Sequence, residues 1–175
     1  LIYARTLGAS DEATGLALDI SSDGKVAVAG SVTGVLQGAV NGALNSTATS
    51  GQSDSFVTLY DAKGDEVWTQ RRGAQQDDEA TAVAFGADGT VYVGGRTKSA
   101  MAGGSAPLGG WDSYLTAYAT SAKGAPTTLF TKTFGTAGDD KITGLVVDGD
   151  KVTTAGVEAG RGVLRGFDMA LTTVT

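Results

Sequence analysis

A segment of about 62 residues occurs three times in succession in this chain, and this repeat restricts the possible folds more than any other feature. The three copies align on Gly8, Gly73 and Gly135 and then agree in four short blocks. Each block is rich in β-branched and aromatic residues and is bounded by turn-forming residues, which is the pattern of a β-strand. The blocks span 2–5, 67–70 and 129–132; 11–18, 78–85 and 140–147; 26–30, 91–95 and 152–156; and 54–58, 112–116 and 168–172.

Turn sequences between the blocks favour hairpins over helices. Asp23-Gly24 and Asp88-Gly89 separate the second block from the third, and glycine accepts the positive φ that tight turns need. No window carries a sustained apolar stripe at helical spacing. We therefore predict an all-β chain of three four-stranded antiparallel meanders with essentially no helix.

The middle copy carries a recognisable combination of motifs. Residues 88–95 read Asp-Gly-Thr-Val-Tyr-Val-Gly-Gly, residues 109–115 read Gly-Gly-Trp-Asp-Ser-Tyr-Leu, and Lys123-Gly124 follows. This pattern resembles the bacterial seven-bladed β-propeller repeat family, and the resemblance covers nearly all of the chain. It implies one four-stranded blade per copy, in a family of mostly large secreted or surface-exposed proteins without known catalysis. The expected fold class is therefore all-β and β-propeller-like, with three blades.

The copies set the expected domain boundaries. We predict a single domain over residues 1–175, with blades at approximately 9–73, 74–135 and 136–175, the last completed by residues 1–8. Pairing of residues 1–7 with 169–174 would cover two sheet edges that otherwise invite aggregation. Propellers usually have about four to eight blades. The chain is therefore expected to be an arc of a larger ring, a ring assembled from several copies, or a compact three-sheet domain inserted in a host protein.

Missing residue types and the charge balance exclude several functions. The sequence has no cysteine and no histidine, which removes disulfides, thiolate nucleophiles, the usual zinc ligands and a Ser-His-Asp triad. Its net charge of −6 argues against nucleic-acid partners and anionic membrane surfaces. No apolar stretch approaches the roughly 20 residues of a membrane-spanning helix. We predict no catalytic residues, no cofactor, no metal and no membrane insertion.

Acidic clusters at 11–12, 77–79 and 139–140 are the main candidates for chemistry. Paired carboxylates are the machinery of glycoside hydrolysis. An active site needs asymmetry, however, and here one feature recurs in each copy, so we interpret these carboxylates as caps on the loop entering each first strand. Residues 138–142 resemble part of a calcium-binding nonapeptide, which needs tandem copies that this chain lacks, so calcium is not predicted.

Aromatic residues and one long loop supply the candidate contact residues. Tyr3, Trp68 and Phe130 share one repeat position and are predicted to pack between sheets. Trp111 differs, because Ser53 and Phe167 stand at its matched positions; at a loop exit it could stack on a sugar, insert into a partner or be buried under its own loop. The loop over residues 31–52 is predicted to be either a contact surface or a cover for the local core. Its candidate contact residues are Val35, Leu36, Val40 and Leu44.

These observations favour a non-enzymatic structural or interaction module of a bacterial secreted or cell-surface protein. The expected partner is another protein or a neighbouring domain of the parent chain, and a homo-oligomer is a further possibility. Two alternatives stay open: a carbohydrate-binding or carbohydrate-active propeller, and a decoration domain inserted in a flagellar or other appendage protein. The expected location is extracellular or at the cell surface.

Overall fold

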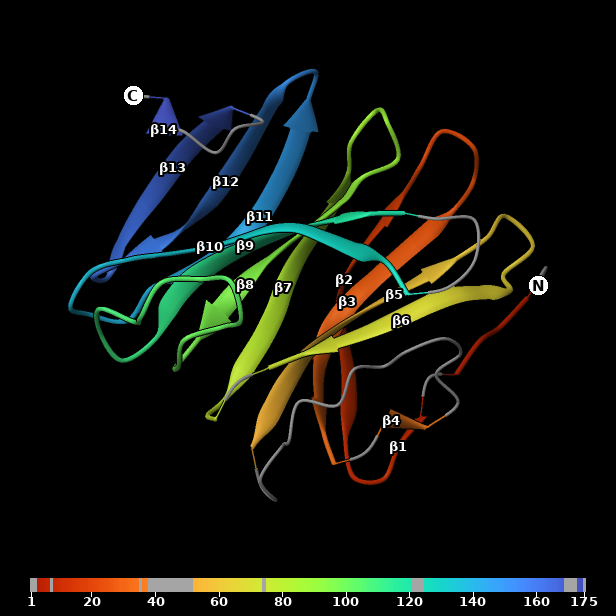
Figure 1. Cartoon of the computed structure of the whole chain (residues 1–175), viewed down its shortest axis with the longest axis horizontal. Coiled ribbons are helices and arrows are strands. Elements are labelled where there is room, and N and C mark those ends of the chain that lie inside the picture. Colours follow the sequence, from red (N-terminus) through yellow and green to blue (C-terminus); the bar gives the residue numbers. More distant parts are fainter. Residues whose placement is uncertain are drawn as a thin grey trace.

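The computed structural model describes residues 3–6, 8–34, 36–37, 52–73, 75–120, 125–168 and 173–174. These residues form three antiparallel sheets of four strands each, and every sheet is a meander in which each strand pairs with the next strand of that sheet along the chain. The predicted all-β fold class is confirmed. Figure 1 shows the sheets arranged one after another across the molecule, with the first sheet near the N-terminus and the third near the C-terminus.

The strands recur in the same order in successive sheets, and each has seven or eight residues except the last strand of the third sheet, which has two. A separate two-stranded ribbon pairs Gly8–Ala9 (β1) with Leu36–Gln37 (β4). The first sheet contains Ala13–Ile20 (β2), Val26–Thr33 (β3), Ser53–Tyr60 (β5) and Glu66–Arg72 (β6). The second contains Asp78–Phe85 (β7), Val91–Thr97 (β8), Asp112–Ala119 (β9) and Thr127–Phe134 (β10). The third contains Lys141–Asp148 (β11), Lys151–Glu158 (β12), Arg161–Asp168 (β13) and Thr173–Val174 (β14).

A β-bulge at the same place in all three sheets demonstrates the repeat at the level of the backbone. The register between the first two strands shifts at Leu16, Thr81 and Thr143. Each bulge brings a carbonyl group over a glycine of the second strand, so closely that a side chain there would overlap it. A Cβ atom would lie 1.9 Å from Thr14 O at Gly30, 1.8 Å from Glu79 O at Gly95 and 2.1 Å from Lys141 O at Gly156.

The bulges also correct two parts of the repeat alignment. Ala13, rather than Asp11, has the place of Asp78 and Asp140, so the first copy of this block is displaced by two residues. At the ladder position where Asp54 pairs in the first sheet and Asp112 in the second, the third sheet has Arg161. Asp168, which the sequence alignment placed there, is therefore not their equivalent. Residues 157–166, predicted as a loop, belong largely to β12 and β13, which a two-residue turn connects.

The predicted completion of the last sheet by the N-terminal segment is corrected as well. In the described residues, β13 pairs with β14 on the side away from β12, so the fourth strand comes from the C-terminal end. The N-terminal residues lie instead at the first sheet, where Arg5 donates a hydrogen bond to Gly64 O and pairs with Asp65 at 3.1 Å. Figure 1 places the two ends of the chain on opposite sides of the molecule. The described part of the N-terminal segment therefore lies at the first sheet, and β14 supplies the fourth strand of the third.

Two large hydrophobic clusters fill the spaces between the sheets. Trp68 is fully buried between the first and second sheets, where its ring centroid lies 6.0 Å from that of Tyr118. Phe130 packs partly buried against the cluster between the second and third sheets, 6.2 Å from Tyr92. The predicted packing of these two matched aromatics between sheets is confirmed. Within the described residues, no helix is long and apolar enough to span a membrane.

Candidate functional site

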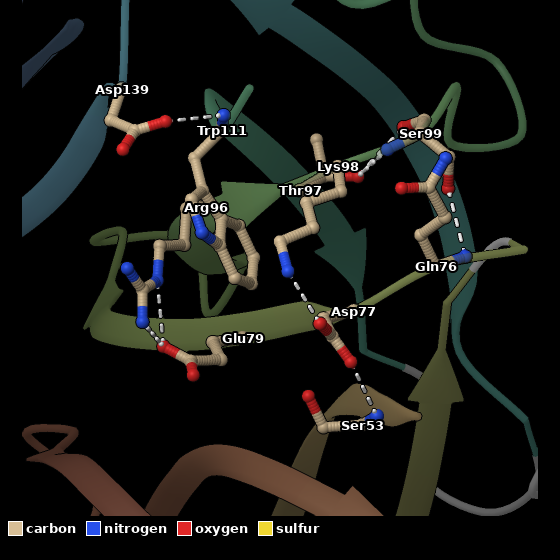
Figure 2. Close-up of polar contacts among 10 residues, drawn as sticks. All are labelled: Ser53, Gln76, Asp77, Glu79, Arg96, Thr97, Lys98, Ser99, Trp111 and Asp139. Carbon is tan, nitrogen blue, oxygen red and sulfur yellow. Dashed lines mark hydrogen bonds and ion pairs between the residues drawn. The ribbon is translucent and has the colours of Figure 1, made fainter. Parts of the chain in front are cut away.

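Trp111 lies between two cationic side chains at one end of the second sheet. It immediately precedes β9, and the register that pairs Thr97 with Asp112 brings the end of β8 beside it. The guanidinium carbon of Arg96 lies 4.1 Å from the indole centroid, and the Lys98 amine lies 4.5 Å from it. Figure 2 shows the ring with Arg96 on one side and the Lys98 amine on the other. Cation–π attraction therefore holds the ring in a defined orientation.

Each of these cations is itself held by a carboxylate of β7 or the residue before it. Arg96 pairs with Glu79 at 2.8 Å, directly across the β7–β8 ladder, and Lys98 pairs with Asp77 at 2.7 Å. The Lys98 hydrogen bond is the main cause that lowers the pKa of Asp77, and a hydrogen bond from Ser53 N adds to it. The indole, two cations and two carboxylates thus form one connected network (Figure 2).

The acidic residues before the first strands connect neighbouring sheets through backbone groups. Asp77 accepts a hydrogen bond from Ser53 N at 3.2 Å, and Asp139 accepts one from Trp111 N at 3.1 Å. Ser53 and Trp111 occupy equivalent places, each just before the aspartate of a third strand. These two carboxylates therefore tie each sheet to the next one. Glu12 stands at the same place before the first strand of the first sheet, where its carboxylate accepts a hydrogen bond from the Thr14 hydroxyl at 3.4 Å, whereas Asp11 lies one residue earlier.

A groove of about 500 Å³ opens beside Trp111. The buried carboxylate of Asp140 lies at its base and is fully engaged, since it accepts hydrogen bonds from Thr136 N at 2.6 Å and Ala159 N at 2.9 Å. The groove joins the second and third sheets, and its walls combine aromatic, apolar and charged groups. The lining residues are Arg96, Trp111, Gly138, Asp139, Asp140, Lys141, Val157, Ala159 and Gly160.

The other predicted contact residues lie apart from this groove. Leu36 is buried in a small cluster with Val32 and Phe56, so at this position the loop covers the local core. Val35, Val40 and Leu44 lie outside the described residues. Of the predicted set, only Trp111 therefore lines the groove. Phe167, taken from the sequence as its counterpart, is instead fully buried at the position of Tyr118.

Sequence reasoning missed Arg96 and Lys98. Arg96 stands near the end of β8 and Lys98 directly follows this strand; the two are two residues apart, and residues spaced by two share a face of a strand. Asp77 and Glu79 show the same spacing on the partner strand. The sequence therefore did contain a signal for this network: two cations at a spacing of two residues at the end of one predicted strand, and two carboxylates at the same spacing at the start of its partner.

The described residues contain no group of three or more Asp or Glu side chains arranged to hold a metal ion. In the calcium-like run at 138–142, the two aspartates direct their oxygens to backbone donors of the protein. Asp139 caps Trp111, while Asp140 accepts the bonds from Thr136 and Ala159. What this end of the molecule presents is a fixed aromatic ring beside a groove of mixed polarity.

Comparison with known proteins gives one informative similarity. No family model matches the chain. The chain is 56% identical, over 177 aligned residues, to a curated relative named "Regulatory protein FlaEY" from Caulobacter vibrioides. The match covers 100% of this chain and 19% of that relative. The chain is therefore similar, along its whole length, to about a fifth of a longer protein whose name is that of a regulatory protein.

Proposed function

We propose that this chain is a non-enzymatic interaction module of a larger regulatory protein, and that it binds a protein partner through the Trp111 groove. The observation that carries the proposal is the fixed indole at the edge of the 500 Å³ groove. Tryptophan and arginine are enriched among the residues that dominate protein–protein binding energy. A ring already ordered by Arg96 and Lys98 loses little further conformational entropy when a partner contacts it.

The cations on either side of Trp111 favour a protein partner over a sugar. Stacking of a sugar requires an open aromatic face, and here Arg96 and Lys98 occupy the space over the ring. A protein segment can instead enter the groove and contact the indole edge while the cations stay in place. The similarity to a longer regulatory protein supports the idea of a module within a larger chain.

Two finer statements belong to the same proposal. The chain is proposed to be a β-propeller-like unit of a secreted or cell-surface assembly, supported by the repeat and by the family resemblance of its middle copy. Insertion in a flagellar or other appendage protein is the alternative setting. Fractionation of cells that express the tagged full protein decides the location, since recovery in the cytoplasmic fraction alone would contradict both settings.

Photo-crosslinking in cells tests the Trp111 groove. A benzophenone amino acid replaces Lys141, an exposed residue of the groove wall, and a matched control carries it at Lys151, which is exposed and outside the groove. We expect a discrete protein adduct from position 141 that disappears when Trp111→Ala is added. The thermal midpoint of Trp111→Ala should match that of the parent, which separates lost binding from lost folding.

Two results would contradict the proposal. One is an adduct that persists unchanged in the Trp111→Ala variant, because the ring would then not contribute to the contact. The other is a sugar-dependent signal in a glycan-binding screen that Trp111→Ala abolishes, which would establish the carbohydrate alternative instead.

A further inference from the structure

The two contacts between sheets within the molecule are built in the same way. We call the face of a sheet that turns toward the sheet before it in sequence its leading face, and the opposite face its trailing face. Val83, Val93 and Tyr118 form the leading face of the second sheet and pack against the first sheet. Tyr92 and Leu115 belong to its trailing face and pack against the third sheet. Each internal contact therefore joins a trailing face to a leading face.

The first sheet carries the same apolar leading face, but the described part of the chain leaves much of it exposed. Leu18 pairs with Val28 across the first two strands, as Val83 pairs with Val93 in the second sheet. Leu18 is 67% exposed, whereas Val83 is 7% exposed. Ile20, at the place of the packed residue Phe85, is 61% exposed. Two large aliphatic side chains thus face solvent at positions that the repeat buries in the next sheet.

The N-terminal segment lies on this same face in the place of a strand from a preceding sheet. Tyr3 matches Trp68 and Phe130 in the repeat, and these two residues belong to fourth strands that pack against the following sheet. Tyr3 and Tyr60 line one cavity of about 330 Å³ on the leading face. Tyr60 is the equivalent of Tyr118, the residue against which Trp68 packs with tilted ring planes. The Tyr3 ring therefore lies on the first sheet much as Trp68 lies on the second.

We propose that the leading face of the first sheet is an interface for another four-stranded sheet of the same repeat, with residues 3–5 in the place of its fourth strand. The proposal rests on the larger protein proposed above, and the 19% share of the longer relative supports the presence of further polypeptide. It concerns a surface different from the Trp111 groove. The occupant should present a trailing face like those of the first two sheets, with an aliphatic residue in its third strand and an aromatic one in its fourth.

The trailing face of the third sheet is less suited to cover the leading face of the first sheet than a further sheet of the longer protein would be. A second copy of this chain, which would present that trailing face, is therefore the less favourable partner. Leu164 stands there at the place of Val57 and Leu115, and Val146 is exposed on the same face, but their pairing partners Ala155 and Thr153 are small or polar. Thr153 and Gly166 pair where Tyr92 and Ala117 pair in the second sheet. A head-to-tail dimer would therefore bring a weakly apolar face against Leu18 and Ile20, and would bury less apolar surface than the internal contacts do.

Thiol labelling tests this interface, because the 175 residues contain no cysteine. Leu18→Cys places a single thiol on the leading face, and Ser22→Cys, at an exposed turn of the same sheet, is the matched control. In the 175-residue chain we expect both thiols to react with a maleimide at similar rates. In the longer protein the thiol at position 18 should react about tenfold or more slowly, since a buried group reacts only when the contact opens, while the one at position 22 stays unchanged.

Two outcomes would overturn the inference. Equal reactivity of position 18 in the short and the long chain would show that no sheet covers the leading face. Protection that appears in the 175-residue chain itself and grows with protein concentration would identify a second copy as the occupant. Neither outcome depends on Trp111, so the crosslinking experiment and this one fail independently.

Discussion

Replacement of Trp68 by alanine is the sharpest test of how the sheets are held together. The ring is fully buried between the first two sheets and lies against Tyr118, with the ring planes inclined at 50°. A buried tryptophan removes about 150–250 Å² from water, and each Å² of apolar surface is worth about 25 cal/mol, so the side chain contributes about 4–6 kcal/mol. Alanine retains part of this area but leaves a cavity, so we expect a loss of about 3–5 kcal/mol in the free energy of unfolding.

Urea denaturation followed by far-ultraviolet circular dichroism measures this loss without relying on the removed fluorophore. The midpoint should fall while the slope stays constant, because the surface exposed on unfolding barely changes. For a chain of this size, the expected fall in melting temperature is about 6–20 °C. Phe130→Ala is the matched control, since that ring has the same repeat position but is only partly buried, and it should lose less. A loss below about 1 kcal/mol for Trp68→Ala would refute the packing argument.

Three further predictions address the backbone, a buried ion pair and a partly buried one. Gly95→Ala should destabilise the chain by several kcal/mol, because its Cβ would lie 1.8 Å from Glu79 O, whereas Gly162→Ala, with no atom within 4 Å, should be nearly neutral in the same melts. Arg71→Met should lower the free energy of unfolding by about 3–5 kcal/mol, because it leaves the buried Asp54 carboxylate without the guanidinium 2.6 Å away. The double variant Arg71→Met/Asp54→Leu removes both charges, so a smaller loss in Arg71→Met alone than in the double variant would argue against that mechanism. The lowered pKa of Asp77 means that its pairing stabilises the fold above the unfolded-state pKa of about 3.9 and is lost as the pH falls through the lower folded-state value. Urea midpoints should therefore decline less steeply below about pH 4 in Asp77→Asn than in the parent, and parallel declines would refute this role.

The repeat made most of the fold predictable, because strands with a period of two and glycine turns are local features. The bulges at Leu16, Thr81 and Thr143 were not predictable, since an extra residue in a ladder has no composition signature of its own. For that reason the sequence comparison placed Asp11, rather than Ala13, beside Asp78. In the third copy, the Ala159-Gly160 turn replaces a long loop, and this shifted the third strand away from its expected place.

The candidate site was predictable only in part. Trp111 stood out because its matched residues differ, but its cations come from another strand and depend on the register between β8 and β9. The burial of Leu36 depends on the packing of Val32 and Phe56, which no local pattern reveals. The fate of the N-terminal segment was missed for a similar reason, since edge pairing alone does not determine which sheet a free strand joins.

The linear arrangement of the sheets has a consequence for how the molecule comes apart. Among the described residues, the middle sheet packs against both other sheets, whereas each outer sheet packs against the middle sheet alone. In repeat proteins, stability is roughly the sum of the intrinsic stability of each repeat and the contacts between neighbouring repeats. Unfolding should therefore begin at the outer sheets and reach the middle sheet last. Amide hydrogens of β7–β9 should thus exchange more slowly than those of β2 or β13, and attaching a neighbour at one end should slow exchange at that end first.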